Sequence, residues 1–193
     1  MDYTALSLPE VQRGLEAVAV EAQGLFGGLD PGQLNWRPDP ARWSVAQCLD
    51  HLLTANRLMI RAADDAQAPG ASRSVWQRLP VLPGILGGML IRSQSPGATR
   101  RFTAPAQAHP ASSDIEADIV RRFVSQHEEA VGRLRTLDES LAARAIMTSP
   151  FVKVVTYRVL DGWRLVLAHD RRHLHQAQGV MASPGFPPSR SLV

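Results

Sequence analysis

Apolar residues recur every three or four positions in four separate stretches of the chain, which is the period of an amphipathic helix. The stretches cover residues 9–26, 44–67, 113–137 and 156–182. In the first of them the repeating apolar positions are Val11, Leu15, Val18, Ala22 and Leu25. Each stretch is therefore predicted to form one helix that turns a single apolar face toward a shared core.

The second stretch carries a clear signal for the start of a helix. Ser44 can cap the first free amides, and Gln47, three residues later, completes a capping-box pattern. His51 borders the apolar stripe of this predicted helix. We therefore expect its side chain to point toward the axis of the bundle.

Residues 68–112 differ from the rest because proline and glycine interrupt them repeatedly. We predict a short helix at about 75–92 and a loop after it, so that the segment forms an insertion that acts as a lid or pocket wall. A shorter link precedes the last helix. There, residues 152–157 are either a short extended piece or the approach to that helix.

Four amphipathic helices with hardly any strand pattern predict an all-α fold. The natural architecture is an antiparallel four-helix bundle with a long insertion between the second and third helices. A chain of 193 residues suits one core. We therefore predict a single domain over residues 1–193.

Charge and hydropathy exclude two classes of partner. The sequence pI is about 9.7, but the net charge is only +3 and the basic residues are scattered. No stripe of alternating basic and aromatic residues occurs, so a nucleic-acid partner is not expected. Residues 81–91 form the most apolar run, and they are too few and too rich in glycine and proline to span a membrane.

Cysteine usage and the N-terminus point to the cytoplasm. The single cysteine, Cys48, excludes an intramolecular disulfide. The first residues show no basic leader followed by an apolar core, so secretion is not indicated. Cys48 lies one turn before His51, where a ligand or reactive thiol is one interpretation, but a small buried apolar role is favoured.

The strongest chemical signal lies in the last predicted helix, where His169 and His173 stand four residues apart. Because a helix turns once in about 3.6 residues, both imidazoles project from one face with Cβ atoms roughly 5–6 Å apart. This spacing is typical of two metal ligands on one helix. A catalytic metal centre usually takes three protein ligands and keeps a position open, so a third ligand must come from elsewhere.

His51 is the best candidate for the third ligand. An isolated histidine in an apolar helix is more often a buried, hydrogen-bonded residue than a ligand. Here, however, it occurs together with the pair in the last helix. One divalent metal ion held by His51, His169 and His173 is therefore predicted.

The motifs around these histidines resemble those of the DinB-like superfamily. The resemblance rests on the Trp43-Ser44-Val45 helix start that leads to His51, on the His169, His173 and Gln176 spacing, and on the order of the helices. It implies a four-helix bundle in which His51 of the second helix and His169 and His173 of the last helix hold a divalent metal ion. We expect this ion to be zinc or nickel. The resemblance also implies a metal-dependent hydrolase, or a thiol S-transferase that uses a low-molecular-weight thiol such as bacillithiol or mycothiol.

The residues near the three histidines receive weaker assignments. Gln176 matches a glutamine of the motif and is expected to hydrogen-bond within the bundle, with a role behind the ligands as the alternative. Asp170 and Asp50 are expected to form surface ion pairs with arginines. His127 is expected to be buried and hydrogen-bonded, with a fourth ligand or a partner behind the ligands as the alternatives. His175 is expected to face solvent.

The predicted substrate is a small molecule that binds against the insertion. The side chains assigned to an apolar pocket are Trp76, Leu79, Leu82, Leu86 and Phe102, and those assigned to a thiol carboxylate are Arg92, Arg100 and Arg101. The surplus of large apolar residues at 75–91 predicts a homodimer. A metal-binding or stress-associated protein without turnover, and an interaction module with structural histidines, stay open as alternatives to an enzyme.

Overall fold

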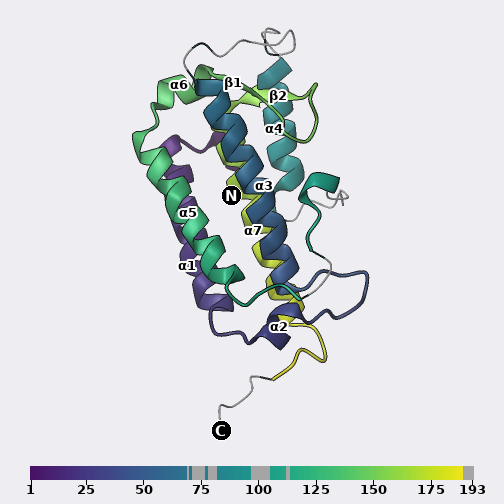
Figure 1. Ribbon diagram of the computed structural model, residues 1–193. Coiled ribbons are helices and arrows are strands. Elements are labelled where there is room, and N and C mark those ends of the chain that lie inside the picture. The colour runs from purple at the N-terminus through teal and green to yellow at the C-terminus, as the bar shows by residue number, and fades with distance from the viewer. Residues whose placement is uncertain (69, 71–76, 78–81, 97–104, 112–113, 189–193) are drawn as a thin grey trace.

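Four long helices make up the body of the protein in the computed structural model (Figure 1). The structure describes residues 1–193 except 69, 71–76, 78–81, 97–104, 112–113 and 189–193. The long helices are α1 (Leu8–Phe26), α3 (Val45–Gln67), α5 (Ile119–Thr136) and α7 (Val159–Met181). The predicted four-helix bundle is confirmed.

Local capping explains where α1 and α3 begin. Ser7 and Glu10 form a capping box at the start of α1, and Ser44 and Gln47 form the predicted one at the start of α3. In the second box the Gln47 amide donates to Ser44 Oγ at 3.1 Å, and Gln47 Oε1 accepts from the Ser44 amide at 3.0 Å. These bonds satisfy amides that have no partner inside the helix. They fix the position of the first turn of α3, which lies one turn before His51.

The side-chain bonds between helices reveal their relative directions. His51 of α3 meets His169 of α7, and Met59, further along α3, meets Tyr157, just before α7, so these two helices are antiparallel. The same relation holds for α1 and α5, because Glu16 bonds to Arg135 and Leu8 bonds to Glu139, which follows α5. Later residues of α3 meet later residues of α5, so that pair is parallel. The long connection between α3 and α5 makes this arrangement, because it returns the chain to the end of the bundle where α3 began (Figure 1).

Part of the insertion forms an additional helix outside the bundle. This helix, α4 (Leu82–Gln94), packs against α7 and lies beside it in Figure 1. The structure describes it only from Leu82, seven residues after the predicted start at position 75. The remaining short helices are α2 (Pro31–Asn35), α6 (Glu139–Arg144) and the 3-10 turns Tyr3–Ala5 and Ala106–Ala108.

A small antiparallel hairpin precedes the last helix and corrects its predicted start. Strands β1 (Ile146–Thr148) and β2 (Thr156–Arg158) pair with Met147 opposite Tyr157. Both of these side chains are fully buried, and the Tyr157 hydroxyl donates to Met59 Sδ at 3.2 Å. The strand therefore uses residues 156–158, which the apolar pattern had assigned to the helix, and α7 begins at Val159.

The third long helix also begins later than its sequence predicts. Asp114 adopts a left-handed backbone conformation with φ of 56°, which a continuing right-handed helix does not tolerate. Beside it, the Ile115 amide donates to Asn35 Oδ1 at 2.9 Å, and Asn35 Nδ2 donates to the Ile115 carbonyl at 2.9 Å. These tertiary bonds hold the chain extended, so α5 starts at Ile119 rather than at 113.

The apolar faces of the four long helices meet in one core. Its largest fully buried side chains include Phe26, Leu49, Phe123 and Leu167. Cys48 is fully buried too, which confirms its assignment as a small apolar residue. Among the described residues, no helix is both long enough and apolar enough to cross a membrane.

Candidate metal centre

Three histidines from two helices meet inside the bundle. His51 comes from α3, and His169 and His173 come from successive turns of α7. The ring centroids lie 5.0 Å apart for His51 and His169, 4.7 Å for His51 and His173, and 4.6 Å for His169 and His173. One candidate ligand atom from each residue lies within 4.8 Å of the others. The fold therefore brings the three predicted ligands together.

A backbone carbonyl of the insertion fixes the orientation of His51. Nδ1 of His51 lies 2.6 Å from the Ala108 carbonyl oxygen, which can only accept, so this nitrogen carries the proton and donates. Nε2 then keeps its lone pair and faces the other two rings. Metal-binding histidines commonly have this arrangement, in which the second ring nitrogen donates to a carbonyl.

The segment that provides this carbonyl is itself attached to the start of α3. The Ala111 amide donates to Asp50 Oδ2 at 2.9 Å, and Gln47 Nε2 donates to the Ala111 carbonyl at 2.9 Å. The end of the insertion is thereby held against the helical turn that carries His51. Residues 106–111 consequently lie beside the start of α3.

Electrostatics keeps the imidazoles neutral. Burial lowers the pKa of His51, and burial together with the neighbouring His173 and His51 lowers the pKa of His169 well below its usual range. Burial, followed by the effects of His51 and Arg172, lowers the pKa of His173 to about 3. Neutral imidazoles offer lone pairs at pH 7, which is the protonation state that a metal requires.

The residues fit a divalent metal ion. Nε2 of His51 and Nε2 of His169 lie 3.2 Å apart. Nitrogens bound at about 2.0–2.1 Å to one tetrahedral or octahedral ion are separated by about 3.0–3.4 Å, so the observed distance suits a shared ion. Nδ1 of His173 is buried without a hydrogen-bond partner. A buried ring nitrogen without a partner costs free energy unless a bound group interacts with it.

An aromatic wall covers one side of the histidines. The Trp43 ring stacks on His173 at a centroid distance of 5.7 Å and an angle of 21°, and it lies 5.0 Å from the His51 ring. The ring of the exposed His109 lies edge-on to the Trp43 ring, with their centroids 6.2 Å apart. Trp43 therefore shields this side of the centre from water.

Comparison with known proteins agrees with this arrangement. The sequence profile of the DinB superfamily matches residues 15–177. The chain belongs to the DinB superfamily. No curated protein sequence matches it significantly.

One solved structure resembles the DinB bundle described above. YfiT from Bacillus subtilis superposes with a TM-score of 0.61 at 15% sequence identity, over 91% of this chain and 86% of YfiT. YfiT is described as a probable metal-dependent hydrolase with an unusual four-helix bundle topology. At this identity the likeness establishes a shared fold.

Two acidic residues of this DinB chain do not lie where the sequence predicted. Asp170 was expected in a surface ion pair, and this is wrong, because it is fully buried and bonded to Asn56 and His127. Asp50 was expected to pair with an arginine, but it accepts the hydrogen bond from the Ala111 amide instead. Both aspartates are next to a histidine of the cluster in sequence. Asp170 bonds to α3 and α5, and Asp50 bonds to the end of the insertion.

The other polar predictions are confirmed in their simpler form. His127 is buried, with Nδ1 2.9 Å from the Phe123 carbonyl oxygen, and it is not part of the histidine cluster. His175 is exposed. Gln176 is also exposed, and its side chain interacts with His173.

Only part of the predicted substrate pocket can be placed. Trp76, Leu79, Phe102, Arg100 and Arg101, and the side chain of Leu82, lie outside the described residues. Leu86 and Arg92 belong to α4, where Leu86 is partly buried and Arg92 is exposed. At the end of α4 the Ser93 carbonyl accepts a hydrogen bond from Arg172 at 2.7 Å. Arg172, which the sequence analysis had not singled out, thus brings a positive charge near the histidines.

Three further features of the site were missed at the sequence level. They are the wall formed by Trp43, the Ala108 carbonyl and the buried group of Asn56, Asp170 and His127. Asn56 did leave a signal, since it is a polar residue within the apolar stripe of its helix. A backbone carbonyl leaves no signal, because every residue has one.

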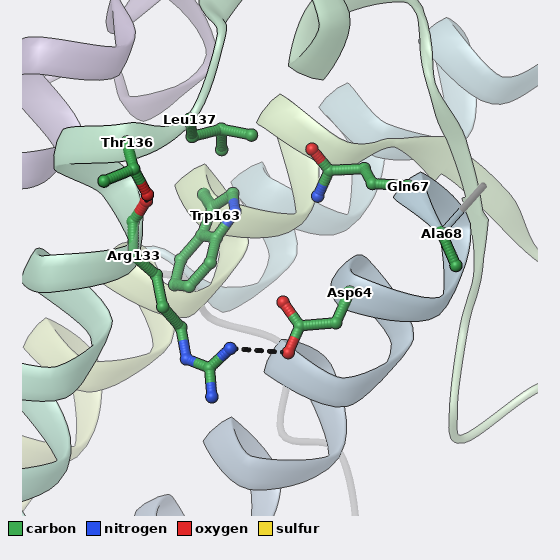
Figure 2. Close-up of a pocket in the computed structure, with 7 residues that line it drawn as sticks. All are labelled: Asp64, Gln67, Ala68, Arg133, Thr136, Leu137 and Trp163. Atoms are coloured by element: carbon green, nitrogen blue, oxygen red, sulfur yellow. Dashed lines mark hydrogen bonds and ion pairs between the residues drawn. The ribbon is translucent and has the colours of Figure 1, made fainter.

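A separate cavity lies near the opposite end of α3, and Figure 2 shows its lining. Its volume is about 280 Å³, and it is lined by Asp64, Gln67, Ala68, Arg133, Thr136, Leu137 and Trp163. Asp64 follows His51 by thirteen residues, or roughly 20 Å along the helix axis. Arg133 Nη1 spans the cavity to Asp64 Oδ2 at 2.7 Å. This cavity is therefore distinct from the histidine site.

Proposed function

We propose that the protein is a mononuclear metalloenzyme in which His51, His169 and His173 hold one divalent ion, zinc or nickel, that activates a small nucleophile. The observation that carries this proposal is the convergence of three neutral imidazoles, those of His51 and His173 buried and that of His169 partly buried, with Nε2 of His51 and Nε2 of His169 3.2 Å apart. Membership of the DinB superfamily supports it.

A divalent ion in this position supplies a Lewis acid that lowers the pKa of a coordinated water or thiol toward neutrality. The protein's own groups prepare the site for it. Ala108 keeps the proton of His51 on Nδ1, so that Nε2 is available. Trp43 excludes water from one side, which strengthens electrostatic interactions within the centre.

The proposed substrate is a small molecule that enters from the side of the insertion and carries an electrophilic centre. The reaction is hydrolysis if water is the nucleophile, or S-transfer if the nucleophile is a low-molecular-weight thiol. The similarity to YfiT, described as a probable metal-dependent hydrolase, favours hydrolysis as the first reaction to test. Arg172, near the histidines, suits a substrate with negative charge on this side.

Metal content of protein purified without a histidine tag tests the site. We expect about one divalent ion per chain by plasma mass spectrometry, and loss of most of it in each of the His51→Ala, His169→Ala and His173→Ala variants. His175→Ala is the matched control, because His175 is an exposed histidine on the same helix. Full metal content in all three variants would show that the ion binds elsewhere.

Turnover tests the reaction. Ester and amide substrates, and a model electrophile with glutathione, cysteine, mycothiol or bacillithiol, are supplied to metal-loaded and metal-stripped protein. A metal-dependent rate with esters or amides alone supports hydrolysis, and one that requires a thiol supports S-transfer. Absence of both rates in protein that binds metal would leave a metal-binding protein without turnover in place of the enzyme.

A further inference from the structure

A buried polar group links three helices next to the histidine site. Asn56 Nδ2 on α3 donates to Asp170 Oδ1 on α7 at 2.8 Å, and His127 Nε2 on α5 lies 3.0 Å from Asp170 Oδ2. Asp170 is fully buried, while Asn56 and His127 are each 2% exposed. Polar groups this deep in a core persist only where their hydrogen bonds are specific.

Both ring nitrogens of His127 have a partner. Nδ1 donates to the Phe123 carbonyl, and Nε2 lies against a carboxyl oxygen of Asp170. Asp170 therefore has a definite partner on each side, and its side chain is held in one orientation.

The position of Asp170 connects this group to the histidine site. Asp170 follows His169 directly in α7, and Asn56 follows His51 by five residues in α3. The Asn56 and Asp170 bond thus joins the two helices that carry the three histidines, about 7–8 Å along α3 from His51. A rotation of α7 about its axis would break this bond, and it would also swing His169 and His173 away from His51.

We propose that Asp170, held between Asn56 and His127, is a positioning residue that sets the rotation of α7 against α3 and so keeps His169 and His173 facing His51. The consequence for metal binding rests on the proposed function, but the positioning itself concerns the metal-free protein. Hydrogen-bonded groups behind metal ligands commonly change metal affinity by about 10–100-fold when they are removed.

Two substitutions of Asp170 separate its hydrogen bonds from its charge. Asp170→Ala removes both bonds, and we expect zinc affinity, measured by competition with a chromophoric chelator, to fall about 10–100-fold. Asp170→Asn can keep both bonds, because the new amide accepts from Asn56 and donates to Nε2 of a neutral His127. We expect this variant to bind zinc within about threefold of the wild type and to give the same cobalt(II) absorption spectrum.

Asp161→Ala is the matched control for a general loss of stability. Asp161 is a buried aspartate of the same helix, bonded to Arg164 at 2.9 Å and eight residues before His169. We expect it to lower the melting temperature without changing zinc affinity more than about threefold. Should Asp170→Ala not fold, Asn56→Leu breaks only the bond between α3 and α7, and it should still weaken zinc binding and alter the cobalt spectrum.

A readout without metal keeps the two proposals distinguishable. In crystal structures of metal-free protein, the distance between His51 Nε2 and His169 Nε2 should increase beyond 3.2 Å in Asp170→Ala and stay unchanged in Asp161→Ala. An unchanged distance and unchanged zinc affinity in Asp170→Ala would overturn the positioning role. Loss of affinity in Asp170→Asn equal to that in Asp170→Ala would also overturn it, since charge rather than orientation would then matter. A wild-type protein that binds neither zinc nor nickel would instead refute the proposed metal centre, while the crystallographic distance still decides the role of Asp170.

Discussion

Acid should destabilise the metal-free protein through its neutral histidines. The pKa of His173 is about 3 in the folded protein against an ordinary value of 6.5. Below pH 6.5 the unfolded chain therefore binds a proton at His173, whereas the folded protein does not. The free energy of unfolding consequently decreases as pH falls from 6.5 toward 3. At about 1.4 kcal/mol per pH unit, the full loss is about 5 kcal/mol, of which about 2 kcal/mol is gone at pH 5. His51 and His169 add to the loss in the same direction.

The assay is urea unfolding of chelator-treated protein between pH 7 and pH 4. His173→Gln removes the titrating group, so its free energy of unfolding should fall by about 2 kcal/mol less than that of the wild type between pH 7 and pH 5. The slope against pH is compared, rather than the absolute stability, because the substitution itself alters packing. His175→Gln, an exposed change on the same helix, should leave the slope as it is. Parallel curves for wild type and His173→Gln would refute the assignment of His173 as a buried neutral imidazole.

The remaining predictions concern packing and association. Cys48 is fully buried and its pKa is raised to about 12, so Ellman's reagent should label it only after unfolding. Gly87→Ala places a new Cβ 2.8 Å from Asp161 Oδ2 and should cost about 1–3 kcal/mol in urea unfolding. Gly88→Ala meets nothing closer than 3.9 Å and should instead stabilise α4 by up to about 1 kcal/mol. Ile85 on α4 is 62% exposed, and we expect it to lie in a homodimer contact. Light scattering should report about twice the 21.1 kDa chain mass for the wild type, and Ile85→Arg should give a monomer. A wild type that is monomeric at high concentration would contradict the dimer.

The long helices and the histidine cluster could be predicted because each leaves a local pattern. Apolar residues at helical spacing mark the buried faces, and the Ser44 and Gln47 pair marks the start of α3 to the residue. His169 and His173 share a face of α7 by spacing alone. Choosing His51 as the third ligand rested on its occurrence together with this pair and on the motif resemblance, because no spacing connects residues that are more than a hundred positions apart.

The elements that were predicted wrongly depend on tertiary contacts. Residues 156–158 have apolar spacing that suits a helix, yet pairing with β1 and burial of Tyr157 make them a strand. The start of α5 is displaced because Asn35, at the end of α2, binds the backbone of Ile115. Neither partner is near in sequence, so no local pattern contains the information.

Asp170 illustrates why charge alone misleads. With arginines at the next two positions, an aspartate is typical of a solvated helix face. It is buried because His127 occupies a core position of α5 and Asn56 interrupts the apolar stripe of α3. These two polar residues in otherwise apolar stripes were the available signal. They indicate that each needs a polar partner, and Asp170 of α7 bonds to both.

In the proposed function, the metal centre and the substrate side depend on different parts of the chain. The three histidines are held by α3 and α7, whose relative rotation is set inside the bundle by Asn56 and Asp170. The surfaces that a substrate would meet come instead from Trp43, just before α3, and from the insertion that ends at the Ala108 carbonyl. A change in the insertion can therefore reshape the substrate side without moving α7, provided that residues 106–111 stay bound to the start of α3. A change at Asp170 has the opposite effect, since it would disturb the centre while leaving the substrate wall in place.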